Sequence, residues 1–149
     1  MDLAGKKISI IGAIRSGIGA AKLVKQLNGI PFVSDASDNE KIKKSSEVLE
    51  DLNISFEIGG HSHRVYDCDM MIVSPGVPLN SEIIMSARDK RIKMISELEL
   101  AASACKGNII AITGTNGKTT TTSLCGHVFN TCGAKTYTAG NIEIGRAHV

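Results

Sequence analysis

An α/β fold built on a parallel sheet is the class that this sequence predicts. Short runs of β-branched and other apolar residues alternate with longer segments of helical periodicity. Because parallel strands need a crossover between them, usually a helix, this alternation favours a parallel sheet. A polar break at Lys106-Gly107-Asn108 then separates a first unit, residues 1–106, from a second unit that begins at residue 107.

The first unit is predicted to contain five strands and four helices. Gly12 ends the first strand, and Ser74-Pro75-Gly76 stops the fourth. Ser96 with Glu99 three residues later has the pattern of a capping box, which predicts a helix start there. The predicted strands are 7–11, 30–34, 54–58, 69–73 and 92–95, with Met70 and Met71 in the core. The predicted helices are 16–27, 39–52, 81–90 and 96–104.

The second unit begins in the same way and then stops. A strand at 109–113 should lead through a glycine-rich turn into a helix that ends near Thr131, followed by a strand at 134–138. One helix and two strands leave apolar faces without partners, so we expect residues 107–142 to be the incomplete start of a domain. Residues 143–149 resemble translated adapter sequence, and we expect them to be a non-native tail of a truncated chain.

Composition favours a small-molecule enzyme over a nucleic-acid or membrane protein. Lys and Arg total 17 against 15 Asp and Glu, so the net charge of +2 is too small for a nucleic-acid footprint. No apolar run reaches membrane-spanning length, and no signal peptide is recognisable. The 4 cysteines have no C-x-x-C spacing, which fits reduced thiols. We expect a cytoplasmic monomer that binds neither nucleic acid nor membrane.

The turn that contains Lys118 has the residues of a phosphate-binding loop. Glycines at 114 and 117 let the chain wrap closely, and a helix amino end and a lysine both attract an anion. The hydroxyl of Thr119, directly after the lysine, is placed to join the Mg²⁺ shell of a bound nucleotide. Ile112 stands where the general P-loop pattern has glycine, and a flexible polar turn is the alternative.

The turn after the first strand, Gly12 to Gly17, lies where a Rossmann-like fold binds a dinucleotide. Its middle glycine is replaced by Ile14, so a structural turn without ligand also fits. Asp35 ends the second strand, and Ser74-Pro75-Gly76 ends the fourth, at the edge where open α/β sheets bind ligands. A Pro-Gly turn without ligand is an equal alternative for the latter.

The stretch from Ile110 to Thr122 closely resembles the ATP loop of the Mur ligases, which join amino acids to a nucleotide-linked peptidoglycan precursor. With Asn116, the Ser96 to Leu100 helix start and Ala139-Gly140-Asn141-Ile142, the chain is similar to the members that add D-glutamate to UDP-N-acetylmuramoyl-L-alanine. The resemblance implies a Rossmann-like domain that binds the UDP precursor, ATP and Mg²⁺ as cofactors, and an acyl-phosphate intermediate. We expect the truncated chain to be inactive alone.

The resemblance also implies roles for individual residues. Lys118 would be catalytic through the charge it offers the transferring phosphoryl group, and Thr119 would bind the metal. The implied ATP-binding residues are Gly114, Thr115, Asn116, Gly117, Lys118, Thr119 and Thr120. The implied residues for the UDP precursor are Arg15, Ser16, Gly17, Asp35, Gly76 and Asn141.

Two other functions remain open at this point. An NAD-dependent dehydrogenase domain would use the turn at Gly12 but leave the loop at Lys118 without a purpose. A P-loop kinase or regulatory NTPase would use that loop but leave the preceding unit unexplained. A metal site at His61 and His63 is disfavoured because no third ligand has suitable spacing, and a surface loop is predicted there.

Overall fold

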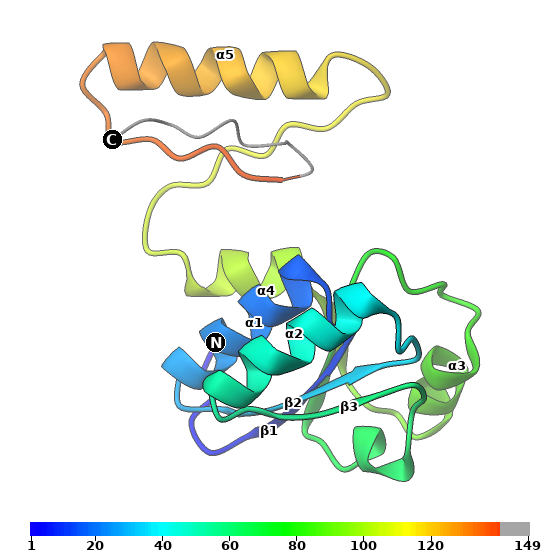
Figure 1. Cartoon of the computed structure of the whole chain (residues 1–149). Helices are drawn as coiled ribbons and strands as arrows, with labels where there is room; N and C mark the ends of the chain where they lie inside the picture. Colours follow the sequence, from blue (N-terminus) through cyan, green and yellow to red (C-terminus); the bar gives the residue numbers. More distant parts are fainter. Residues whose placement is uncertain (141–149) are drawn as a thin grey trace. The chain divides into compact units, whose positions relative to one another are not determined.

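The computed structural model describes residues 1–140, so the roles predicted for Asn141 and for the tail at 143–149 lie outside the described residues. The chain divides into two compact units, Met1–Cys105 and Lys106–Val149, referred to as unit 1 and unit 2. Figure 1 shows the chain and labels many of the helices and strands named below.

Unit 1 alternates strands and helices as predicted. Its strands are β1 (Lys7–Ile11), β2 (Ile30–Asp35), β3 (Ser55–Ile58), β4 (Met70–Val73) and β5 (Met94–Ser96). Its helices are α1 (Arg15–Gln26), α2 (Glu40–Asp51), α3 (Glu82–Asp89) and α4 (Glu97–Ala104), with a 3₁₀ turn η1 (His63–Tyr66). The predicted strands and helices of this unit are therefore confirmed, while η1 was not foreseen.

The sheet is parallel throughout, with strand order β3-β2-β1-β4-β5. The chain builds outward from β1 to β3 and then returns to the other side of β1 to add β4 and β5. The order therefore reverses between β1 and β4. In open α/β sheets, the carboxyl ends of strands at such a reversal form the crevice that binds ligands.

Successive strand residues face opposite sides of the sheet, and both sides are covered. Ile10 packs with α1, α2 and α4, which lie over the same face of the sheet (Figure 1). Ile11 faces the other side and packs with η1 and α3. Met70 and Met71 are buried on opposite faces, which confirms their predicted place in the core. Because both faces of these strands are covered, most strand residues are apolar, which explains the near-continuous apolar runs in the sequence.

Side chains begin two of the helices by satisfying N–H groups that have no partner within the helix. Asn39 accepts from the N–H groups of Lys41 and Ile42 at the start of α2. Ser96 and Glu99 form the predicted capping box at the start of α4. No helix within residues 1–140 is both long enough and apolar enough to cross a membrane.

Unit 2 is described over residues 106–140 and contains one helix, α5 (Lys118–Thr131), as predicted. The chain after α5 turns back along it. Ala134 N donates to Phe129 O at 2.9 Å, and Thr136 N donates to Asn130 Oδ1 at 3.1 Å. Thr138 covers Gly126, where an added Cβ would lie 2.4 Å from Thr138 Cγ2.

The strands predicted at 109–113 and 134–138 are wrong for the described residues, since neither segment is a strand in the structure. A strand is stable only when a neighbouring strand takes up its backbone hydrogen bonds and a second layer buries its face. Within residues 106–140 these segments have neither, and Ile110 is 62% exposed. Their β-branched composition is the feature that suggested strands.

Candidate functional site

Three loops follow β1, β2 and β4 at the carboxyl edge of the sheet in unit 1. The strand register places the first residues of these loops side by side, because Ile11 lies opposite both Ser34 and Val73. The loops therefore meet beside the reversal of strand order between β1 and β4. This is the position at which a doubly wound sheet binds a nucleotide.

The turn after β1 is shaped by two glycines. Gly12 has φ +108°, and its N–H donates to Ser34 O at 2.9 Å. Gly17 is buried in the first turn of α1, where a Cβ would lie 1.9 Å from Gly12 O. Only a residue without a side chain fits there, so the turn can fold tightly against the helix.

Neither a capping side chain nor an acidic residue of its own first turn offsets the partial positive charge at the amino end of α1. Ile14 occupies the N-cap position without a side-chain hydrogen bond, and the first turn of α1 contains no acidic residue. Arg15 and Ser16 are exposed as the first residues of the helix. Since the first N–H groups of a helix have no partner within it, this end can hold an anionic group, with Arg15 adding a full positive charge.

Asp35, at the end of β2, braces the same turn. Its Oδ2 accepts from Ala13 N at 2.8 Å, and its Oδ1 accepts from Ser37 N at 2.9 Å. The carboxylate is half-buried and its two oxygens already have backbone partners. Each oxygen retains a further lone pair, so a ligand hydroxyl or N–H could still be accepted.

Gly76 is exposed in the turn after β4, whose first residue is held by Ser74 N donating to Ile11 O at 3.0 Å. The structure thus brings five of the residues predicted to bind the UDP precursor to one edge of one sheet. These five are Arg15, Ser16, Gly17, Asp35 and Gly76. The sixth, Asn141, lies outside the described residues.

A polar network beside this edge was missed by the sequence interpretation. Ser34 lies opposite Glu57 in the register and donates its hydroxyl to Glu57 Oε1 at 2.8 Å. Glu57 also accepts from the N–H of Ser62 at 2.9 Å and from its hydroxyl at 2.6 Å. The segment after β3 is thereby pinned onto the sheet.

His61 completes the network: it lies in a loop as predicted, but it is less exposed there than a surface position implies. It is half-buried, and its Nδ1 lies 2.6 Å from Ser34 Oγ. Because the single Ser34 proton is given to the Glu57 carboxylate, the Nδ1 of His61 must carry the hydrogen that it donates to Ser34. The contact could be found only from the register of β2 against β3, which cannot be read from the sequence.

The surroundings move the pKa of both titratable groups in the network downward. Burial lowers the pKa of His61 from its ordinary 6.5, against the opposing negative charges of Glu57 and Asp35. Burial alone would raise the pKa of Glu57, but hydrogen bonds from Ser62 and Ser34 and the charge of Arg64 outweigh it, so that the pKa falls below its ordinary 4.5.

The predicted phosphate loop in unit 2 has backbone conformations that suit an anion. Gly114 has φ +149°, and Gly117, the N-cap of α5, has the left-handed φ of +76°. The Lys118 ammonium folds over the loop and donates to the carbonyl oxygens of Gly114 and, at 3.2 Å, of Thr115. The loop therefore curls around a single positive charge at a helix amino end, an arrangement that fits a phosphate.

The other residues predicted to bind ATP are exposed around this lysine: Thr115, Asn116, Thr119 and Thr120. The Thr119 hydroxyl, which the resemblance assigns to Mg²⁺, is in the first turn of α5. Within residues 1–140 no three His, Cys, Asp or Glu side chains form a group that could hold a metal. A single hydroxyl such as that of Thr119 fits a metal that is bound chiefly through nucleotide phosphates.

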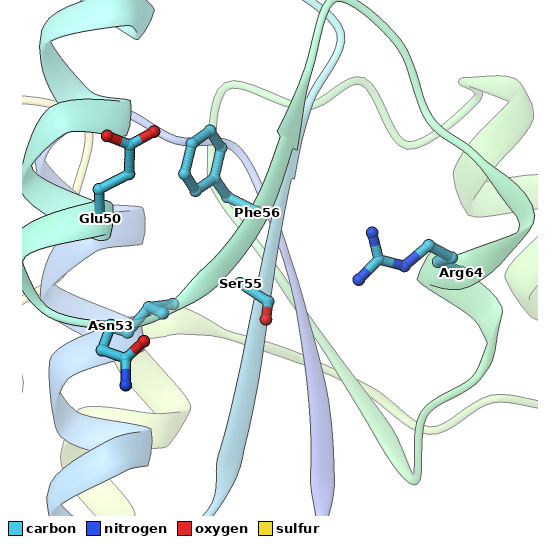
Figure 2. Close-up of a pocket in the computed structure, with 6 residues that line it drawn as sticks. Glu50, Asn53, Ser55, Phe56 and Arg64 are labelled. Carbon is cyan, nitrogen blue, oxygen red and sulfur yellow. The ribbon is translucent and has the colours of Figure 1, made fainter.

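A surface pocket of about 370 Å³ lies away from the carboxyl edge of the sheet. It lies at the amino end of β3 and is lined by Glu50, Asn53, Ile54, Ser55, Phe56 and Arg64. In Figure 2, Glu50 and Phe56 lie on one side of β3 and Arg64 on the other. It contains none of the residues predicted for a site and reflects the open outer edge of the sheet, so we assign it no ligand.

Two family models match the chain in sequence. The model described as the MurD N-terminal domain matches residues 7–83, and the model described as the Mur ligase middle domain matches residues 112–148. The first match covers β1 to the start of α3, and the second covers the loop at Lys118. Both matches agree with the resemblance drawn from the Lys118 loop.

Two similar curated relatives share one description, UDP-N-acetylmuramoylalanine--D-glutamate ligase. UDP-N-acetylmuramoylalanine--D-glutamate ligase of Geotalea daltonii is 40% identical over 143 residues, which cover 95% of this chain and 32% of the relative. The enzyme of the same description from Koribacter versatilis is 41% identical over 143 residues, again 95% of this chain and 32% of the relative. The chain spans about a third of the length of the curated relatives it matches.

Solved structures agree on the fold. A UDP-N-acetylmuramate-alanine ligase from Thermotoga maritima aligns with a TM-score of 0.58 and 26% identity, covering 84% of this chain and 29% of that one. A murein peptide ligase from Psychrobacter arcticus aligns with a TM-score of 0.60 and 23% identity, covering 87% of this chain and 27% of that one. The second likeness supports the fold alone.

Proposed function

Because the chain belongs to the family of the MurD N-terminal domain, we propose that it is the nucleotide-binding part of an ATP-dependent ligase that adds D-glutamate to UDP-N-acetylmuramoyl-L-alanine. One observation supports this proposal above the others. The glycine turn after β1, the Asp35 carboxylate and the turn after β4 meet at the reversal of strand order. A nucleotide-linked precursor is the ligand that this arrangement suits.

In this proposal, unit 1 holds the precursor by its UDP group. The free N–H groups of Arg15, Ser16 and Gly17 and the Arg15 guanidinium would bind the diphosphate. Asp35 would accept a hydrogen bond from the uridine, and the exposed backbone at Gly76 would approach the diphosphate from the other side. Asn141 is proposed to contact the same precursor. Ile14, which stands in place of the middle glycine of a dinucleotide loop, is 57% exposed and so is not part of the core.

Residues 107–142 are proposed as the beginning of the ATP-binding domain, with the loop from Gly114 to Thr120 around the nucleotide phosphates. ATP would supply a phosphoryl group that converts the unreactive precursor carboxylate into an acyl phosphate, which the amine of D-glutamate attacks. Lys118 would exchange its carbonyl partners for phosphate oxygens and offset their charge. The Thr119 hydroxyl would contribute to the Mg²⁺ shell.

We propose that the protein is cytoplasmic, because ATP and the nucleotide precursor are cytoplasmic metabolites, and that it acts as a monomer. Among the residues that the structure describes, no three His, Cys, Asp or Glu side chains are grouped so that they could hold Mg²⁺. We propose that the 149-residue chain binds its nucleotides without turnover. A phosphate-release assay with precursor, D-glutamate and ATP checks this, and sustained release would contradict it.

Calorimetric titration of the whole chain tests the function directly. We expect UDP-N-acetylmuramoyl-L-alanine to bind and NADH not to bind. Lys118→Ala should lower the affinity for ATP with Mg²⁺ by at least about tenfold, through loss of a charge-assisted contact, and leave the precursor affinity unchanged. Lys135→Ala, a lysine of the same unit outside the loop, is the matched control.

The outcomes separate the alternatives. Binding of NADH without the precursor would favour a dehydrogenase and overturn the proposal. Equal ATP affinities for Lys118→Ala and Lys135→Ala would contradict the role of the loop. Binding of ATP by a chain that ignores the precursor would instead favour a kinase or a regulatory NTPase.

A further inference from the structure

Gly12, Ser74 and Glu97 are each the first residue after a strand, and they stand in one row across the sheet edge. The register places Ile11 beside Val73 and Val73 beside Ser96. The next residue of each strand therefore continues the row from β1 through β4 to β5. Glu97 is the only acidic residue in this row of three, two strands away from the turn that we assign to the diphosphate.

Ser74 fills the space between the β1 turn and Glu97. A Cβ on Gly12 would lie 2.6 Å from Ser74 Oγ and 2.8 Å from Ser74 Cβ, so the serine side chain contacts the Gly12 backbone directly. A Cβ on Gly17 would lie 3.7 Å from the same hydroxyl oxygen. The serine side chain thus sets how far the turn can move toward β4.

Glu97 holds this serine in place. Ser74 Oγ donates to Glu97 Oε1 at 2.5 Å, and both side chains are half-buried. A hydrogen bond to a carboxylate is stronger than one between neutral groups. Because the hydroxyl proton is committed to Glu97, the serine has one preferred rotamer, in which its oxygen faces the turn.

The turn is consequently braced from two sides by two carboxylates. Asp35 accepts from Ala13 N on the β2 side, and Glu97 acts through Ser74 on the β4 side. Asp35 was recognised from its place at a strand end. Glu97 was seen only as part of a helix start, and its contact with Ser74 joins residues 23 positions apart.

We propose that Glu97 is a positioning residue for diphosphate binding: its hydrogen bond to Ser74 sets the position of the Gly12 to Gly17 turn opposite Gly76. This inference rests on the proposed function of unit 1 as a UDP site. Glu97 touches no ligand in this scheme. Loss of Glu97 should therefore weaken the binding of the diphosphate and leave the binding of the nucleoside unchanged.

The test compares UDP with uridine on the whole chain, titrated by amide chemical shifts in NMR spectra. Glu97→Ala should weaken UDP binding by about tenfold, the scale of one lost hydrogen bond, and change uridine binding by less than about twofold. Glu97→Gln keeps an oxygen acceptor for Ser74 and should stay within about threefold of the unchanged protein for both ligands. Glu40→Ala, the first residue of α2, is the matched control.

A double-substitution cycle checks that Glu97 acts through Ser74. Ser74→Ala should reproduce the loss of UDP affinity, and Ser74→Ala with Glu97→Ala should lose no more than either alone. If Glu97→Ala does not fold, Glu97→Asp withdraws the carboxylate by one methylene and keeps its charge. The amide shifts of Gly12 and Gly17 should then move in this variant before ligand is added.

Three results would overturn the inference. Unchanged UDP affinity in Glu97→Ala or Glu97→Asp would show that the turn does not depend on this carboxylate. Equal losses for UDP and uridine would reduce Glu97 to a general structural role. Failure of the unchanged chain to bind UDP would instead reject the proposed UDP site itself, and the positioning role with it.

Discussion

The two glycine-containing turns of this chain look alike in sequence and are held in different ways. In unit 1 the turn at Gly12 is fixed by residues from other strands, including the carbonyl of Ser34 and the carboxylate of Asp35. In unit 2 the turn at Gly117 is held by its own neighbours, as Lys118 bonds Gly114 and Thr115. The first turn depends on the whole sheet, and the second is a local structure.

Burial separates the units in the same way. Ile10 is completely buried between the sheet and α1, whereas Ile110 is 62% exposed. Both lie in runs of similar composition. An apolar run therefore becomes a core strand only when other segments of the chain cover it, and in unit 1 they do so on both faces.

Replacement of these two isoleucines should give the largest difference between the units. Ile10→Ala should lower the free energy of unfolding by about 3 kcal/mol, since it removes a buried side chain and leaves a cavity. Ile110→Ala should change it by about 0.5 kcal/mol or less. Urea denaturation followed by circular dichroism measures both. Similar losses for the two variants would mean that Ile110 is as well packed as Ile10.

Two glycines of α1 test how tightly the first turn is packed. Gly17→Ala should cost about 2 kcal/mol, because its Cβ would lie 1.9 Å from Gly12 O and must displace backbone. Gly19→Ala, in the same helix with open space around its Cα, should stabilise by about 0.5–1 kcal/mol through higher helix propensity. Thermal unfolding distinguishes them. Stabilisation by both variants would show that the turn is loose.

The smallest effect expected is a pH dependence of stability that His61 and Glu57 of unit 1 contribute. The pKa of His61 is lowered by burial, so the stability gained from its neutral ring is present above pH 6.5 and is lost as pH falls through the folded value. Burial by itself would raise the pKa of Glu57, but hydrogen bonds from Ser62 and Ser34 outweigh it and lower the pKa. Its contribution is present above pH 4.5 and is lost below, through the folded value.

The corresponding variants isolate each window. His61→Gln should flatten the stability curve just below pH 6.5, and Glu57→Gln should flatten it below pH 4.5. Each effect should be less than about 1 kcal/mol, because both groups remain partly in contact with solvent. His63→Gln is the control for His61, because His63 is exposed on the neighbouring 3₁₀ turn. Unfolding midpoints measured across the pH range would contradict this if His61→Gln and His63→Gln gave the same curve.

Most of unit 1 could be predicted because its signals are local. Strand runs, the Ser96 and Glu99 capping box and the Gly12 turn each depend on a few neighbouring residues. The network of Ser34, Glu57 and His61 could not be predicted, since it needs the register of β2 against β3. The strands at 109–113 and 134–138 were wrong for the related reason that pairing partners are a property of the fold.

The amino-acid order alone determined the α/β class, the sites of chain reversal and the glycines and lysine of the two turns, because these follow from backbone conformation and side-chain chemistry over short distances. The tertiary structure decided which loops meet at the sheet edge, that Glu97 reaches Ser74, and that His61 is half-buried. Those contacts depend on parallel register and layer packing, which arise only when segments distant in the chain are brought together.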